Sequence, residues 1–315
     1  GDESDLPVGC GRYKFVKSGE EIGLEVNSLY KNYSPNIGNV TLVPIKDVDS
    51  MQSSLSIGNT VFSFDDLSKG EYLRLSAKNV NVTLNHLIFI GINGANSYFS
   101  SSFLRRAVNA AVDRENIALS AFRGYAKTAY SPFNPDWYQL LSRDLVFQPD
   151  VETAEDFVIS SGVDVKNRYI NLIVFEDNAF KCEAAGLIEE SLEKIGFAVN
   201  VKECSEEEYR NLIEIGGYDL YIGEVALTEN MDLNCFFAPE NTFGVDGEGQ
   251  SALRYFELMS GNCEIMDFIN TFNEDIPFVP LCYRCAVASY TNSLKADFTP
   301  NSFDVFSDFE SWKLN

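Results

Sequence analysis

Histidine is almost absent from this sequence, since His86 is the only one in 315 residues. A Ser-His-Asp or Cys-His catalytic site would have to use it, yet His86 stands at the start of an apolar, strand-like run, a position typical of a packed or edge residue. The chain also lacks a Gly-x-Ser-x-Gly elbow, a Walker loop and a Gly-x-Gly-x-x-Gly turn after a strand. We therefore expect no enzyme activity and no cofactor. A hydrolase with two catalytic carboxylates is the alternative, although no pair of acids stands out.

Positive charge is scarce as well. The chain has 24 Lys and Arg against 47 Asp and Glu, which gives a net charge of −23. No basic patch is visible, so the phosphate backbone of a nucleic acid would be repelled, and we expect no nucleic-acid partner. No apolar run has the length of a membrane-spanning helix. With 45% hydrophobic and 23% charged residues the composition is that of an ordinary folded protein, long enough for two lobes.

The cysteines do not follow the spacing of a disulfide scaffold. There are seven of them, so at least one is expected to be free. Cys282 and Cys285 have the spacing of a redox or metal pair, but they lie in the strand-like run LCYRCAVASY, where positions three apart point to opposite faces. With one histidine and no second cysteine pair at finger spacing, we expect structural thiols and no metal site.

The order of patterns between residues 152 and 225 predicts an α/β lobe. Apolar positions at helical spacing alternate with short apolar runs rich in β-branched residues, and glycines end the helices. The expected order is helix 152–161, strand 169–175, helix 179–195, strand 197–201, helix 205–216 and strand 218–225. Short links in such an alternation are typical of right-handed strand-helix-strand units. The first ninety residues are instead mixed, with a hairpin over 13–26, a helix over 47–57 and strands at 72–75 and 86–92.

The segment 103–124, FLRRAVNAAVDRENIALSAFRG, predicts a helical elbow. Ser102 can cap its first helix, whose apolar stripe is formed by Leu104, Ala107, Val108 and Ala111. Asp113 can cap a second short helix, and Gly124 can end it in the left-handed conformation.

The residues of this elbow resemble a family motif. In the extracytoplasmic solute-binding proteins of family 5, a strand ending in Asn is followed by Arg-x-Ala-x-x-x-Ala-x-Asp-(Arg/Lys)-x-x-Ile and then Gly. Here the strand is 87–93, and the matching positions are Arg106, Ala107, Ala111, Asp113, Arg114, Ile117 and Gly124. The resemblance continues in a Pro-Val-Gly block at 7–13, in runs at 192–199 and 218–220, and in Pro-x-Val-Pro-Leu at 277–281.

The resemblance implies a fold. It is an α/β, periplasmic-binding-protein-like fold of the class II type with two lobes. Residues 1–94 and 276–315 would form a partial first lobe around a mixed sheet, and residues 95–275 would form the second, α/β lobe. Because members of the family are longer before the Pro-Val-Gly block, the first lobe is expected to be incomplete.

The resemblance also implies a function. We expect the substrate-binding component of an ABC importer, which captures a peptide or a similar small solute in a cleft by hinge closure, without covalent chemistry. Its partners would be the solute and the permease subunits in the membrane. It would act as a monomer outside the cytoplasm, as a surface lipoprotein or in a periplasm. A recognition or sensing module with the same fold and no transport role is the alternative.

Two segments contain the candidate ligand contacts. Phe133 and Trp137 lie in a Pro-rich loop that the resemblance places near the cleft, although such a loop can equally cover a core with aromatic side chains. In peptide-binding members an Asp accepts the terminal amine of the ligand, and Leu227 occupies the aligned position. The nearby acids are Glu224, Glu229 and Asp232, for which the alternative interpretation is a solvated carboxylate.

Overall fold

The computed structural model describes residues 6–31, 33–70, 77–95, 98–141, 143, 145, 149–166, 169–239, 243–245, 247–296, 299–301 and 303–315. The chain forms two compact units: unit 1 consists of Gly1–Asp66, Glu71–Val82 and Ala286–Asn315, and unit 2 of Leu67–Gly70 and Thr83–Cys285. Their boundaries fall inside two long strands, β5 (Lys78–Ile92) and β10 (Phe278–Tyr290). The lobe boundaries drawn from the sequence at 94/95 and 275/276 stay a prediction, and the expected strand 72–75 lies outside the described residues.

Unit 1 contains a small antiparallel sheet near the start of the chain. Its strands β1 (Tyr13–Ser18), β2 (Glu21–Val26) and β3 (Asn39–Leu42) are ordered β1-β2-β3, which confirms the predicted hairpin. Helix α1 (Val48–Ser56) begins at Asp47, whose side chain accepts a hydrogen bond from the Ser50 backbone, 2.7 Å away. The remaining elements are β4 (Phe62–Asp65), β11 (Leu294–Lys295), β12 (Lys313–Leu314) and the 3₁₀ turn η2 (Phe309–Ser311).

Aromatic contacts join the beginning of unit 1 to its end. The ring of Phe309 lies 5.6 Å from that of Tyr13, in an edge-on arrangement. Trp312 is buried and lies 5.2 Å from Phe62, measured between ring centres. Residues from both ends of the sequence therefore share one small aromatic core.

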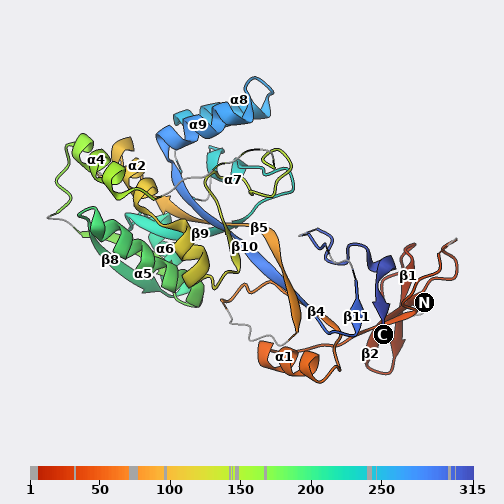
Figure 1. Cartoon of the computed structure of the whole chain (residues 1–315). Helices are drawn as coiled ribbons and strands as arrows, with labels where there is room; N and C mark the ends of the chain where they lie inside the picture. Colours follow the sequence, from red (N-terminus) through yellow and green to blue (C-terminus); the bar gives the residue numbers. More distant parts are fainter. Residues whose placement is uncertain are drawn as a thin grey trace. The chain divides into compact units, whose positions relative to one another are not determined.

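A mixed sheet organises unit 2 (Figure 1). Within this unit the order is β10-β5-β9-β7-β8, and β6 (Ala126–Thr128) pairs with β10. Strands β7 (Tyr169–Phe175), β8 (Ala198–Cys204) and β9 (Leu220–Ala226) run parallel to one another, and β9 pairs antiparallel with β5. The predicted alternation of strands and helices between 152 and 225 is confirmed. The links between β7, β8 and β9 are α5 (Ala179–Lys194) and α6 (Glu206–Glu214).

The two faces of this sheet differ in chemistry because successive residues of a strand point to opposite sides. Phe89 on β5 and Tyr221 on β9 contribute to a large aromatic core, in which the rings of Phe236 and Phe278 stack at 4.1 Å. Helices α7 (Asn234–Phe237), α8 (Gln250–Met259) and α9 (Ile265–Asp275) also contribute to this core, and Figure 1 shows α8 and α9 packed as a pair. The alternate residues of β9, Glu224 among them, point to the other face.

The helical elbow lies at one end of the sheet. It consists of α2 (Ser102–Ala111), the single turn α3 (Arg114–Asn116) and the π-helical turn η1 (Ile117–Ala121), and α2 packs against α4 (Val151–Ser161). The predicted cap at Asp113 is confirmed, because its side chain accepts from the Asn116 backbone at 3.0 Å. The predicted cap at Ser102 is wrong. Ser101 is the N-cap residue, its side chain makes no capping hydrogen bond, and Ser102 is already helical.

Arg114 attaches the elbow to the sheet. Its buried guanidinium donates to the carbonyl oxygens of Pro280 and Asn109, at 2.7 and 3.1 Å, and to the side-chain oxygen of Asn109 at 2.5 Å. Burial lowers the pKa of Arg114 to about 10, so the group stays charged at neutral pH. A buried charge is tolerated only when its donors are satisfied, and these acceptors meet that requirement.

Candidate functional site

A buried cluster of charged side chains lies around Glu224 in unit 2. Glu224 is on β9, and the cluster brings it together with Arg284 on β10, Lys181 in the first turn of α5 and His86 on β5. Its Oε1 atom lies 2.7 Å from Nε of Arg284 and 3.0 Å from Nδ1 of His86, and its Oε2 atom lies 2.6 Å from Nζ of Lys181. Both oxygens of Glu224 are therefore occupied.

The cluster is open to solvent at one side only. The side chains of Arg284, Lys181 and Glu224 are 3%, 12% and 18% exposed, whereas that of His86 is 36% exposed. Burial by itself would raise the pKa of Glu224, but the hydrogen bond with His86 and the charges of Lys181 and Arg284 outweigh it and hold the pKa well below its usual range.

This arrangement carries a net positive charge. Two cations, Arg284 and Lys181, face the one carboxylate of Glu224. Glu224 is fully paired and so cannot offer an oxygen to an incoming ammonium group without breaking an ion pair. The excess of positive charge suits the cluster to a polar or anionic group, and His86, its most exposed member, lies on the side from which such a group can approach.

The Pro-rich loop packs against the aromatic core. Phe133 is buried there, and its ring lies 5.1 Å from that of Trp137. The hydroxyl of Tyr283 on β10 holds the loop by donating to the carbonyl oxygen of Pro132 at 2.6 Å. The indole Nε1 of Trp137 is buried and has no acceptor among the residues that the structure describes. Phe133 thus covers the core, and Trp137 keeps one polar atom unsatisfied.

The remaining candidate residues occupy three different environments. Leu227 is buried in the aromatic core, whereas Glu229 is exposed. Asp232 has partners within the fold: it accepts from the Tyr255 hydroxyl at 3.0 Å and from the Asn234 backbone at 2.7 Å. The structure therefore brings Phe133, Trp137 and Leu227 to one core and places Glu224 on the opposite face of the sheet. Their roles in ligand binding stay predictions.

Sequence reasoning missed Lys181 and Arg284 as parts of the site. Arg284 is the one charged residue in the apolar run LCYRCAVASY, and Glu224 is the one charged residue in the apolar run YIGEVA. A single charge inside an apolar strand needs a buried partner of opposite sign, so these two runs together contained the signal. Lys181 carried no such signal, because a lysine in the first turn of a helix is common on protein surfaces.

The cysteines of the chain are present as thiols. Each of the seven cysteines is free, as expected for at least one of them, and Cys282 and Cys285 are buried in β10. Within the described ranges, no group of three or more His, Cys, Asp and Glu side chains is placed to hold a metal ion. No helix in the same ranges is long and apolar enough to cross a membrane.

Comparison with known proteins identifies the fold. The chain superimposes on the ABC transporter substrate-binding protein CtaP of Listeria monocytogenes with a TM-score of 0.79 and 19% identity, over 100% of this chain and 68% of that one. It superimposes on NikA of Brucella suis, solved with Fe(III)-EDTA, with a TM-score of 0.72 and 15% identity, over 97% and 68% of the two chains. The expected α/β, periplasmic-binding-protein-like fold of the class II type is confirmed.

Sequence comparison gives the relationship. The chain is 26% identical to the oligopeptide-binding protein AppA of Bacillus subtilis over 216 residues, which are 62% of this chain and 39% of that protein. It is 22% identical to the nickel-binding protein NikA of Staphylococcus aureus over 317 aligned positions, covering 98% of this chain and 61% of that one. The chain thus spans between about two fifths and three fifths of these relatives. Residues 1–238 match the sequence model of the bacterial extracellular solute-binding proteins, family 5, and the chain belongs to that family.

Proposed function

We propose that this chain acts as the substrate-binding component of an ABC importer for peptides or a similar small solute. Its family membership over residues 1–238 carries the proposal. The relatives named above include an oligopeptide-binding and a nickel-binding protein, so peptides and small metal complexes are the solute classes to test first. The protein would act outside the cytoplasm as a monomer, and it would deliver the solute to permease subunits in the membrane.

The Glu224 cluster is the proposed ligand contact in unit 2. Since both oxygens of Glu224 are paired and the cluster has an excess of positive charge, it would favour a carboxylate over an ammonium at this position. Trp137 packs against the aromatic core on the other face of the sheet, so a contact between its ring and the ligand is a separate prediction. Binding would occur by closure about a hinge, without any covalent step.

A thermal-shift screen tests the function. The full-length protein is heated with a peptide library, with nickel complexes and with small sugars. A solute that binds only the folded state, present at about 100 times its Kd, stabilises by about 2.7 kcal/mol. For a protein of this size that corresponds to a rise in Tm of roughly 5 °C. A binding peptide should lose most of its shift when its terminal carboxylate is amidated.

Two further results decide the transport role. Cells without the gene should lose uptake of the solute found in the screen, and expression of the gene should restore it. If no solute class raises Tm, the binding function is wrong. If a solute binds but uptake is unchanged in the deletion strain, the protein is a recognition or sensing module and the importer role is wrong.

A further inference from the structure

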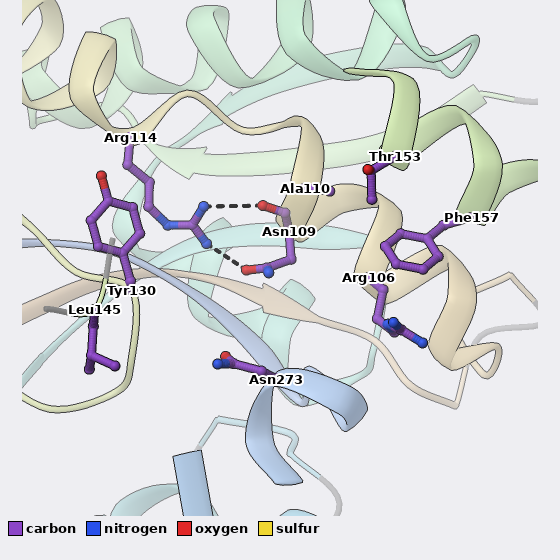
Figure 2. Close-up of a pocket in the computed structure, with 9 residues that line it drawn as sticks. All are labelled: Arg106, Asn109, Ala110, Arg114, Tyr130, Leu145, Thr153, Phe157 and Asn273. Atoms are coloured by element: carbon purple, nitrogen blue, oxygen red, sulfur yellow. Dashed lines mark hydrogen bonds between the residues drawn. The ribbon is translucent and has the colours of Figure 1, made fainter. Parts of the chain in front are cut away.

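A pocket lies in unit 2 at the helical elbow, and none of its residues belongs to the Glu224 cluster (Figure 2). It is formed where α2 and α4 meet the Pro-rich loop and the end of α9. Its volume is about 230 Å³, below the roughly 300–1,000 Å³ of sites for drug-sized ligands, so an occupant would be small. The lining residues are Arg106, Asn109, Ala110, Arg114, Tyr130, Leu145, Thr153, Phe157 and Asn273.

Arg106 gives this pocket a cation with no acid beside it. Its guanidinium carbon lies 4.1 Å from the centre of the Phe157 ring on α4, which fixes the plane of the group. Among the described residues Arg106 has no carboxylate within ion-pair distance, although the chain has about twice as many acids as bases. The next residue, Arg105, shows the contrast, because it is paired with Asp275 at 2.7 Å. The stacked face of Arg106 is occupied and the hydrogen-bonding edge is available.

Asn109 adds two donors to the same pocket. The Arg114 guanidinium donates to the Asn109 side-chain oxygen at 2.5 Å. Because a guanidinium only donates, the oxygen of the amide must face Arg114 and the NH₂ group must face away from it. Figure 2 shows this orientation, and no acceptor for the NH₂ group occurs among the described residues. Arg106 and Asn109 are three positions apart on α2, so their side chains are neighbours on one helix face.

The hydroxyl protons of the pocket are already used. The Tyr130 hydroxyl donates to Glu115 at 2.8 Å, and the Thr153 hydroxyl donates to Asp150 at 2.5 Å. Neither acid lines the pocket, and no Asp or Glu is among its nine lining residues. No carboxylate of the lining would repel a ligand acid, and the donors left to it are the guanidinium of Arg106 and the amide groups of Asn109 and Asn273. The rings of Tyr130 and Phe157 and the side chain of Leu145 form apolar walls.

We propose that this pocket binds a small carboxylate with a flat apolar body, such as an aromatic acid. The carboxylate accepts hydrogen bonds from the guanidinium edge of Arg106 and from the NH₂ group of Asn109, an arrangement in which the charge-assisted bonds to Arg supply most of the affinity. The flat body lies against the apolar walls. This pocket is separate from the Glu224 cluster, the proposed contact for the imported solute. The proposal therefore does not depend on the transport function.

Benzoate and benzamide, which have the same shape and differ in charge, test the proposal on the unmodified protein. Each is titrated into full-length protein carrying ¹⁵N-labelled arginine, and the Nε–H signal of Arg106 is identified by its loss in the Arg106→Gln variant. Benzoate should shift this signal saturably, whereas benzamide should bind at least about tenfold more weakly. Benzoate bound at the Glu224 cluster would leave the Arg106 signal in place.

Asn109→Asp is the decisive variant. It keeps the size of the side chain and an oxygen for Arg114, so the elbow should stay folded, but it replaces the two donors by a negative charge. Benzoate affinity should fall at least about tenfold. Arg210→Gln on α6, which removes an exposed arginine paired with Glu206, should change nothing. Equal shifts of the Arg106 signal by benzoate and benzamide, or unchanged benzoate binding by Asn109→Asp, would overturn the proposal.

Discussion

The ring of Tyr221 on β9 lies directly over Gly91 on β5, in the space that a Cβ atom at position 91 would occupy. The two residues are opposite each other in the antiparallel ladder. Two positions along each strand the arrangement is reversed, with the ring of Phe89 over Gly223. Each aromatic side chain thus crosses the neighbouring strand at a glycine, and the aromatic core of unit 2 depends on both glycines.

Gly91→Ala should destabilise the protein, because the new methyl group would overlap the Tyr221 ring. Overpacking of this kind costs about 1–3 kcal/mol. Urea unfolding followed by tryptophan fluorescence measures the loss. Gly186→Ala is the matched control: a Cβ at that position in α5 meets open space, so the better helix propensity of alanine should raise stability by about 0.5–1 kcal/mol. Equal effects of the two variants would contradict the steric argument.

Acid should weaken the protein through Glu224. Its pKa in the folded state is depressed, so the ion pairs contribute fully above the unfolded value of about 4.3 and are lost as the pH falls below it. Between about pH 5 and about pH 3 the wild type should therefore lose more unfolding free energy than Glu224→Gln. Glu206→Gln, at an exposed pair on α6, should follow the wild-type curve. If the unfolding free energy of Glu224→Gln fell with pH in parallel with that of the wild type, the cluster would not contribute to the acid sensitivity.

At neutral pH, Glu224→Gln should also be less stable than the wild type. It leaves Arg284 and Lys181 buried without their carboxylate, and removing one partner of a buried pair costs about 3–5 kcal/mol. Urea midpoints at pH 7 measure this cost. Replacement of exposed Glu206 by Gln should change stability by less than about 1 kcal/mol. Similar midpoints for both variants would mean that water reaches the cluster freely.

Arg114→Lys should destabilise the elbow even though it keeps the charge. A lysine cannot reach the Pro280 and Asn109 oxygens together in the fork geometry of the guanidinium, so buried acceptors lose their donors, at about 1–3 kcal/mol each. Thermal unfolding measures the change. Arg210→Lys on the exposed face of α6 should stay within about 0.5 kcal/mol of the wild type. An Arg114→Lys protein as stable as Arg210→Lys would refute this role.

Thiol reactivity should separate the cysteines. Burial raises the pKa of Cys285 to about 11 and that of Cys282 further, so neither forms a thiolate readily near pH 8. Cys10 is exposed and should react with an alkylating reagent first. Peptide mapping by mass spectrometry after brief labelling should show modified Cys10 and unmodified Cys282 and Cys285, and labelling in urea should modify all three. Rapid labelling of Cys282 in the folded protein would contradict its burial.

Local features of the fold could be predicted from the sequence, and distant contacts could not. The strand at Tyr169–Phe175 and the cap at Asp113 follow from periodicity and from side chains within three residues. The π-helical turn could not be predicted. It depends on a hydrogen bond from the Phe122 amide to the Ile117 carbonyl, five residues earlier, where an α-helix would use the carbonyl four residues earlier. It was packing against neighbouring elements that decided this geometry.

The candidate site shows the same limit. Glu224 could be selected as an acid in an apolar strand, but its partner His86 is 138 positions away along the chain and Arg284 is 60. Only the strand order brings these residues together. Lys181 comes from a helix whose first turn gave no signal at all. Charge inside an apolar run predicts that a partner exists, and the fold determines which residue it is.

The strand order also has a consequence for how the chain is made. Strand β10 starts at Phe278 and pairs with β5, so this edge of β5 stays unpaired until residue 278 and those that follow it have left the ribosome. Until then β5 exposes a strand edge whose side chains at Leu87–Ile90 are fully buried in the finished protein. Nascent chains that stop before residue 278 should therefore aggregate or bind chaperones, and completion of folding should be slow compared with that of the local helices.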